Sequence, residues 1–284
     1  MAKWLKWIGY CVWGFLCLLL FFHLLFPYEA MGRRMLHTME QQTNLTVSPS
    51  EFHQRFLGIR WARVEVLYPG QEAFPPIEIQ DWVFQLHIPS LLVGRLSARS
   101  HGTVLGGSFQ ATVRVGRKGH QGVAEWEGIQ IDRFPIPSTD EASFGCSVFG
   151  KILWEKFDQR IDGESLFEIR DGKIRNLQLP GLKLPLLDLG QIQGQMNWSG
   201  GRIAFKEVSI GGGDLRGRLT GHVDIQNPFQ RSRVVCRLEI EATERFLKRY
   251  PAIKAFYNRG DGQPRPFVVS IRGTVEDPRF SLAK

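Results

Sequence analysis

The chain contains only four cysteines among its 284 residues, and no C-x-x-C pair or cysteine–histidine cluster has zinc-ligand spacing. Cys11 and Cys17 lie in an apolar N-terminal segment, which leaves Cys146 and Cys236 as the pair able to form a disulfide. Two buried free thiols are the alternative, because Cys236 has the inward phase of an expected strand. The pattern argues against a disulfide-stapled scaffold.

Catalytic motifs are also missing. The seven histidines are scattered, with no H-E-x-x-H, and the sequence has no G-x-S-x-G nucleophile elbow. The stretch Gly211-Gly212-Gly213-Asp214 lacks the Gly-Lys-Ser/Thr ending of a phosphate loop and precedes a strand pattern, so we interpret it as a strand connection. We therefore predict a non-enzymatic protein with no catalytic residues, no cofactor and no metal.

The positive charge is modest and spread along the chain. The formal net charge is +8, and two of the 36 basic residues, Lys3 and Lys6, precede the apolar segment, so 34 basic side chains face 28 acidic ones in the rest. The basic residues occur singly along strand-like runs instead of clustering with aromatic residues. This distribution is typical of a solvated face and argues against nucleic acid as a partner, whereas anionic lipid headgroups stay compatible with it.

One long uncharged run stands at the N-terminus. Residues 7–26 contain no formal charge, and as a helix they would span roughly 30 Å of hydrocarbon. A cleaved signal peptide is the alternative, but the run is longer than a usual signal core, and Phe26-Pro27-Tyr28-Glu29-Ala30 is no small-x-small cleavage site. We predict an uncleaved transmembrane anchor.

The anchor sets the expected organisation. A short N-terminus normally stays inside, so a single span places the bulk of the chain in the periplasm of a bacterium, at the inner membrane. A faint similarity between Gly106-Gly107-Ser108-Phe109 and Gly212-Gly213-Asp214-Leu215 leaves duplication open. The expected parts are a cytoplasmic N-terminus (1–6), the anchor (7–26), a juxtamembrane helical turn and linker (27–50) and a periplasmic β domain (51–284), with 51–135 and 160–284 as the two halves if it is duplicated.

After residue 51 the sequence alternates between apolar and polar residues. In Leu215–Ile225 the odd positions are apolar or small and the even ones polar, which is typical of a half-buried antiparallel strand. Asp171-Gly172 and Ser199-Gly200-Gly201 predict hairpin turns. Helical spacing appears over 244–257, interrupted by Pro251, and more weakly over 144–157. The expected fold is mainly β: one N-terminal transmembrane helix, then an antiparallel, curved or sandwich-like β domain with one or two short helices.

One-sided strands must cover their apolar side with a second sheet, a helix or an apolar ligand. A close-packed second layer is the favoured interpretation, and a groove lined by lipid is the alternative. The residues expected to line such a groove are Phe205, Leu215, Leu219, Val223, Val234, Leu238, Ile240, Phe267, Val269 and Ile271.

Several segments together carry a family resemblance. They are Phe26-Pro-Tyr-Glu-Ala30, Gly32-Arg33-Arg34, Leu179-Pro-Gly-Leu-Lys-Leu-Pro185, Gly212-Gly-Asp-Leu-Arg-Gly217 leading into Leu219-Thr-Gly-His-Val-Asp-Ile225, and Ile271-Arg-Gly-Thr-Val-Glu-Asp-Pro-Arg-Phe280. In this order the chain resembles the type II secretion system protein N family. The resemblance implies an accessory inner-membrane component that contacts other subunits of that secretion system and has no catalytic residues.

That family is in turn distantly similar to AsmA-type envelope proteins, whose anchored sheets form an apolar groove associated with lipid traffic. This second similarity implies the alternative function, a periplasmic protein that binds or transfers phospholipid.

Overall fold

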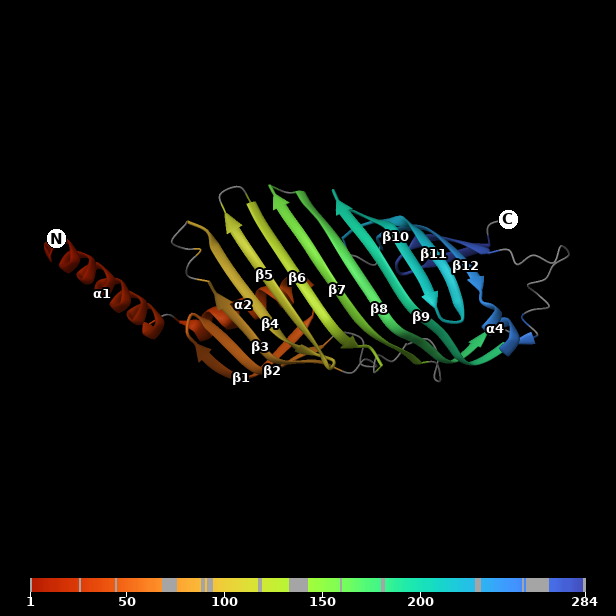
Figure 1. The fold of residues 1–284 in the computed structure, drawn as a ribbon, viewed down its shortest axis with the longest axis horizontal. Helices are drawn as coiled ribbons and strands as arrows, with labels where there is room; N and C mark the ends of the chain where they lie inside the picture. The colour runs from red at the N-terminus through yellow and green to blue at the C-terminus, as the bar shows by residue number, and fades with distance from the viewer. Residues whose placement is uncertain are drawn as a thin grey trace.

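Fourteen antiparallel strands form one continuous open sheet, in which each strand pairs with the next along the chain (Figure 1). The computed structural model describes residues 2–282 except 26, 44, 68–75, 88–89, 91–93, 117–118, 133–142, 159, 180–181, 228–230, 252 and 254–265. The strands are β1 (Thr46–Arg55), β2 (Gly58–Leu67), β3 (Ile77–Leu86), β4 (Leu96–Val104), β5 (Gly107–Gly116), β6 (Gly119–Gln130), β7 (Ser143–Phe157), β8 (Arg160–Leu179), β9 (Leu182–Ser199), β10 (Arg202–Gly212), β11 (Leu215–Asp224), β12 (Arg233–Ala242), β13 (Phe267–Thr274) and β14 (Pro278–Leu282).

The mainly β class is therefore confirmed, and the sheet forms a single layer. Among the described strands, the substantial strand–strand contacts are between sheet neighbours, apart from a small contact between β9 and β11, which flank β10. The second packed layer favoured from the sequence is wrong for the part of the chain that the structure describes. The physical reason is the pairing order: every strand is added in antiparallel orientation beside the previous one, so none of the described strands folds back over the sheet.

The register aligns one residue of every strand in an unbroken row on one side of the sheet. We call this side the apolar face and the opposite side the polar face. The row is Gln54, Ile59, Phe84, Ser100, Ala111, Ala124, Ile152, Ser165, Met196, Phe205, Gly221, Cys236, Ile271 and Phe280. Because side chains alternate between the two sides of a strand, residues two positions before or after a member of this row lie on the same face of the sheet.

Three tryptophans on the apolar face lie across glycines of the paired strand. The pairs are Trp154 on Gly122, Trp126 on Gly150, and Trp198 on Gly163. A Cβ added at any of these glycines would overlap the indole ring, so each ring lies against the backbone of its neighbour. Strand side chains normally stand roughly perpendicular to the sheet. The glycines thus keep this part of the face low and flat.

Helix α1 (Ala2–Leu25) extends from the sheet and ends at the β1–β2 hairpin (Figure 1). The Nε2 amide of Gln54 donates to the His23 carbonyl oxygen at 3.0 Å, and the rings of His23 and Phe56 lie 5.1 Å apart between centroids. Over Lys6–Leu25, α1 is the one described helix long and apolar enough to cross a membrane.

Helix α2 (Tyr28–Thr43) covers the apolar face at its N-terminal end. Tyr28 and Leu36 are buried there, eight residues apart on one side of the helix. Gly32 lies between them, and a Cβ at this position would be 3.1 Å from Ile59 Cδ1 and 3.0 Å from Trp61 Cζ2. The glycine lets the helix approach β2 closely.

The segment 27–50, expected to be a helical turn and linker, is more ordered than that. It contains the whole of α2, and β1 begins within it at Thr46. Glu40 Oε1 accepts the Val47 backbone N–H at 2.9 Å, which ties the end of the helix to the first strand.

Helix α4 (Glu244–Arg249) covers the apolar face near its other end. Thr243 caps its start by accepting the Phe246 N–H, and Phe246 is buried against Leu184 and Leu187. The helical spacing expected over 244–257 is thus confirmed for its first part, with Pro251 after the helix; residues 254–257 lie outside the described residues.

Two local expectations are wrong and one is confirmed. Residues 144–157 form β7 instead of a helix, because apolar residues occur on both of its faces: Phe149, on the polar face, packs under the Arg170 guanidinium, 4.3 Å from ring centroid to Cζ. Asp171-Gly172 is an irregularity inside the continuous strand β8, where Asp171 has a φ of 55°. Gly200-Gly201 does form the predicted β9–β10 hairpin turn, with both φ values positive.

Candidate functional site

All ten residues predicted to line a groove lie together on the apolar face. Register pairs connect members of the set across β11 to β13, for example Val223 to Val234, Leu219 to Leu238, and Leu238 to Val269. Phe205 on β10 joins the same face through its pairing with Gly221 on β11. None of the ten is fully buried, and Phe267 is 44% exposed. The sequence pattern therefore predicted the side of the sheet correctly, and the structure leaves that side open to a ligand.

The apolar face extends well beyond the strands singled out from the sequence. A second row crosses β6 to β13 and is dominated by isoleucine. It consists of Ile129, Val148, Ile169, Ile192, Ile210, Gly217, Ile240 and Phe267. The alternation in β6 to β9 could have indicated these residues, but long strands with irregular register made the phase hard to follow. The face is continuous from β4 to β13.

Charge is nearly absent from this face. Among the described register positions of β4 to β13 on this side, Lys156 is the one charged residue, and His120 lies opposite it on β6. Both are near the ends of their strands, where β6 begins and β7 ends. The central part of the face therefore offers an apolar ligand no competing charge.

A buried ion pair holds α4 against the sheet. Asp214 is fully buried in the β10–β11 connection; its Oδ2 accepts the Asp188 backbone N–H at 3.0 Å and lies 2.9 Å from Arg249 Nη1 at the end of α4. The stretch before Asp214 is a strand connection, as predicted. Sequence patterns could not indicate these contacts of Asp214, because Asp188 lies 26 and Arg249 lies 35 residues away along the chain.

The polar face carries hydrogen-bonded side chains that run from strand to strand. Across β4 to β7, Arg99 donates to Gln110, Gln110 donates to Glu125, and Lys151 Nζ lies 2.7 Å from Glu125 Oε1. The hydrogen bond from Lys151 holds the pKa of Glu125 below its usual value, and the bond from Gln110 adds to the effect. This side of the sheet is built to face water or a polar partner.

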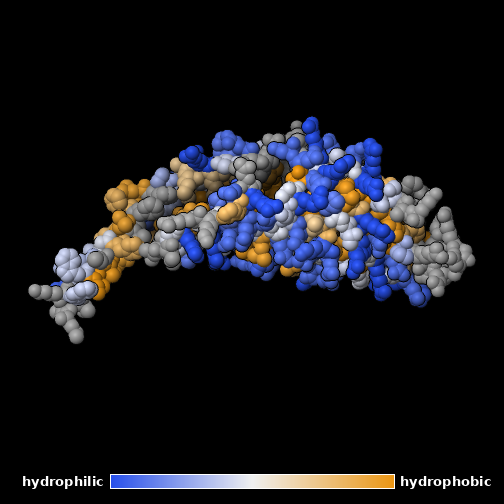
Figure 2. Space-filling model, turned by 90° about the horizontal axis from the view of Figure 1, so that it is seen from above, coloured by the Kyte–Doolittle hydropathy of each residue, from blue (hydrophilic) through white to orange (hydrophobic). Residues whose placement is uncertain are grey.

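The hydropathy of the surface agrees with this division. Figure 2 shows orange residues recessed between blue ones on the body of the molecule, and a run of orange residues along α1. The strand register places apolar residues such as Ile152 and Met196 on the apolar face, and charged residues such as Glu125 and Lys151 on the polar face.

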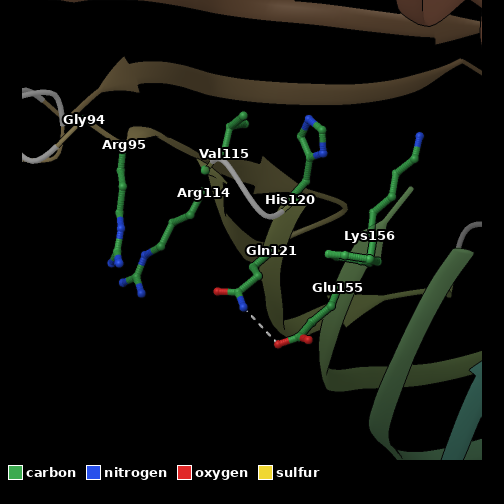
Figure 3. Close-up of a pocket in the computed structure, with 11 residues that line it drawn as sticks. Gly94, Arg95, Arg114, Val115, His120, Gln121, Glu155 and Lys156 are labelled. Carbon is green, nitrogen blue, oxygen red and sulfur yellow. Dashed lines mark hydrogen bonds between the residues drawn. The ribbon is translucent and has the colours of Figure 1, made fainter. Parts of the chain in front are cut away.

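A cavity of about 620 Å³ lies where strands β4 to β7 meet the upper edge of the sheet. Figure 3 shows that its lining divides between the two faces: Arg95, Arg114 and Gln121 point one way, while His120 and Lys156 point the other. Gln121 donates to Glu155 at 3.1 Å on the polar side. The cavity therefore lies at the ends of these strands and is not an extension of the apolar face.

Cys146 and Cys236 are free and buried. They lie on β7 and β12, and the five strand spacings between these strands alone amount to about 24 Å, which is too far for a disulfide. Of the two alternatives, buried free thiols are thus confirmed, and burial raises the pKa of both.

Metal ligands do not gather in the described part of the chain, where no three His, Cys, Asp or Glu residues are placed to hold an ion. Comparisons with protein-family models, curated proteins and solved structures found no match to this chain. The candidate site is therefore defined by its geometry alone: an open apolar sheet face joined to an apolar N-terminal helix.

Proposed function

We propose that this protein is anchored in a membrane by α1 and binds the acyl chains of a lipid on the apolar face of its sheet. The observation that carries the proposal is the continuous, half-exposed apolar face of a single-layered sheet. In the bacterial setting expected from the sequence, α1 lies in the inner membrane and the sheet in the periplasm.

The size of the apolar face favours a bound ligand. With strands about 4.8 Å apart, fourteen strands extend about 60 Å, and the six residue steps from Val148 to Trp154 cover about 20 Å across the face. The area is on the order of 1,000 Å², whereas monomeric proteins rarely expose apolar patches of more than a few hundred. Helices α2 and α4 cover only its ends.

The dimensions also suit a lipid chain. One leaflet of a bilayer core is about 15 Å thick, so an acyl chain fits within the 20 Å width of the face. Each methylene group removed from water contributes about 0.8 kcal/mol. The hairpin that contacts the end of α1 belongs to the same sheet, so a lipid leaving the membrane would reach the open part of the face beyond the strands that α2 covers.

Adjacent residues of β7 provide a matched test. Ile152 lies on the apolar face, and Leu153, its neighbour, lies on the polar face with 41% of its surface exposed. The full chain should be purified in a mild non-ionic detergent and its bound lipid measured by native mass spectrometry. We expect Ile152→Glu to lower lipid occupancy about tenfold or more, because it places a charge among acyl chains, and Leu153→Glu to leave occupancy unchanged.

Two results would contradict the proposal. One is a wild-type protein that carries no lipid after gentle extraction. The other is an equal loss of lipid in both variants when circular dichroism shows that both are folded.

A second candidate function is an accessory role in type II secretion. It is favoured by the segments that resemble the protein N family, several of which border the β10–β11 connection and the last two strands. In this role the polar face contacts other subunits of the secretion system. Deletion of the gene should then lower the amount of secreted enzymes in the culture medium; normal secretion with an altered outer membrane would favour the lipid-binding function instead.

A further inference from the structure

Three arginines gather on the polar face where β4 and β5 pair. Ser97 on β4 lies directly opposite Arg114 on β5, and Arg99 lies opposite Thr112. Arg99 stands two residues after Ser97 on β4, and Arg95 stands two residues before Ser97, directly ahead of the strand. Both are therefore diagonal neighbours of Arg114, within reach of a long side chain. All three line one cavity of about 740 Å³.

Two of these arginines lack an acidic partner. Neither Arg95 nor Arg114 forms an ion pair with any residue that the structure describes, and both side chains are exposed. Their side chains extend in the same direction from the strand ends (Figure 3). Glu125, the acidic residue in this lining, is bound by Lys151 and Gln110, and Glu155, in the lining of the neighbouring cavity, accepts a hydrogen bond from Gln121. Positive charges on neighbouring strands repel each other, and an anion bound between them offsets this repulsion.

The rest of the lining supplies neutral hydrogen-bonding groups. Ser90 lies in the connection before β4, where its Oγ is 2.9 Å from His87 Nδ1, and Gln121 reaches the cavity from β6. Guanidinium groups bind phosphate oxygens through paired N–H donors. A volume of about 740 Å³ exceeds that of a lone phosphate ion and lies in the range of pockets for small organic ligands.

We infer that Arg95, Arg99 and Arg114 form a binding site on the polar face for a phosphate-bearing polar group larger than inorganic phosphate. The site does not depend on the apolar face, because the two lie on opposite sides of the sheet. Its ligand is either a free phosphorylated molecule or the phosphorylated headgroup of a lipid, which share the same anionic chemistry.

The test compares two double variants with the same change of charge. Arg95→Gln/Arg114→Gln alters the site, whereas Arg218→Gln/Arg272→Gln removes two exposed arginines from the polar face of β11 and β13. Each full-length protein, in non-ionic detergent, is titrated calorimetrically with inorganic pyrophosphate. We expect the site variant to bind at least about tenfold more weakly than wild type and the control to bind normally, with binding that weakens as salt rises.

Mixed micelles distinguish the two sources of the phosphate group. Tighter binding of phosphatidylglycerol than of pyrophosphate, lost in the site variant, assigns the site to a headgroup; the reverse order assigns it to a free phosphorylated molecule. Equal affinities for the two double variants, no pyrophosphate or phosphatidylglycerol binding by wild type, or tighter binding of polyglutamate than of either would overturn the inference. Loss of acyl-chain binding in Ile152→Glu would leave this result unaffected.

Discussion

Removal of the Arg249 side chain should destabilise the protein more than removal of both partners of its ion pair. Asp214 is fully buried, and Arg249, at the end of α4, is 34% exposed. In Arg249→Leu the carboxylate stays buried with only the Asp188 N–H bound to it. In Asp214→Asn/Arg249→Leu the amide oxygen still accepts that N–H, and no buried charge remains.

The magnitude follows from the burial of the two groups. Breaking a buried ion pair from one side costs roughly 3–5 kcal/mol. Because Arg249 is partly hydrated, the lower end, about 3 kcal/mol, applies to Arg249→Leu. Asp214→Asn loses a charge-assisted hydrogen bond but leaves the arginine free to meet water, so we expect about 1–2 kcal/mol. The double variant should cost about 1–2 kcal/mol less than Arg249→Leu alone.

The free energy of unfolding in denaturant measures the three costs, and hydrogen exchange at the α4 amides shows where they arise. Protection of the Leu247 and Tyr250 amides, which bond to Thr243 and Phe246, should fall most in Arg249→Leu. The reasoning is refuted if the costs of the single variants simply add in the double variant, because additivity would mean that Asp214 gains nothing from Arg249.

Three further predictions concern the face, the charges and the anchor. Gly122→Val should push the Trp154 indole away from the sheet, which costs about 1–3 kcal/mol of stability through overpacking. The tryptophan fluorescence should shift, whereas a spectrum like that of wild type would show that the valine fits without displacing the ring. Because Lys151 lowers the pKa of Glu125 in the folded state, their bond stabilises the protein at pH values above the ordinary pKa of 4.5, and this contribution is lost as the pH falls through the lowered pKa. In denaturant titrations, the difference in free energy of unfolding between wild type and Glu125→Gln should therefore shrink on acidification. A difference that grows on acidification would contradict a lowered pKa. Deletion of residues 2–25 should release the protein from membranes without detergent, measured by fractionation; retention in the membrane pellet would identify a second anchor.

Local patterns predicted those parts of the fold that depend on neighbouring residues. The ten apolar residues lie on one side because alternation with a period of two is a property of each strand by itself. The Gly200-Gly201 turn was found because two consecutive positive φ values demand glycine. The same reasoning misplaced Asp171-Gly172, since an irregularity within a long strand uses the same residues as a turn.

The site features that the sequence did not reveal depend on strand register. Arg95 and Arg114 are 19 positions apart in the chain, and only the pairing of β4 with β5 makes them neighbours. Asp214 and Arg249 meet only because α4 folds back over the sheet. The spacing of residues within one helix or strand could not have indicated that Arg95 lies beside Arg114, or Asp214 beside Arg249.

The number of layers was the expectation most open to error, and the reason is physical. A strand in a sandwich and a strand in an open sheet show the same alternation, because each has one dry side and one wet side. The two folds differ in how the strands are connected. In an open sheet each new strand pairs with the previous one at the same edge, whereas in a sandwich the chain crosses over to begin a second sheet. In this chain each strand pairs with its successor from β1 to β14, so within the described residues the apolar side has no second layer of protein over its middle strands. This unmet requirement for burial, together with an apolar helix whose end contacts the β1–β2 hairpin, supports the proposal that a membrane lipid occupies the face.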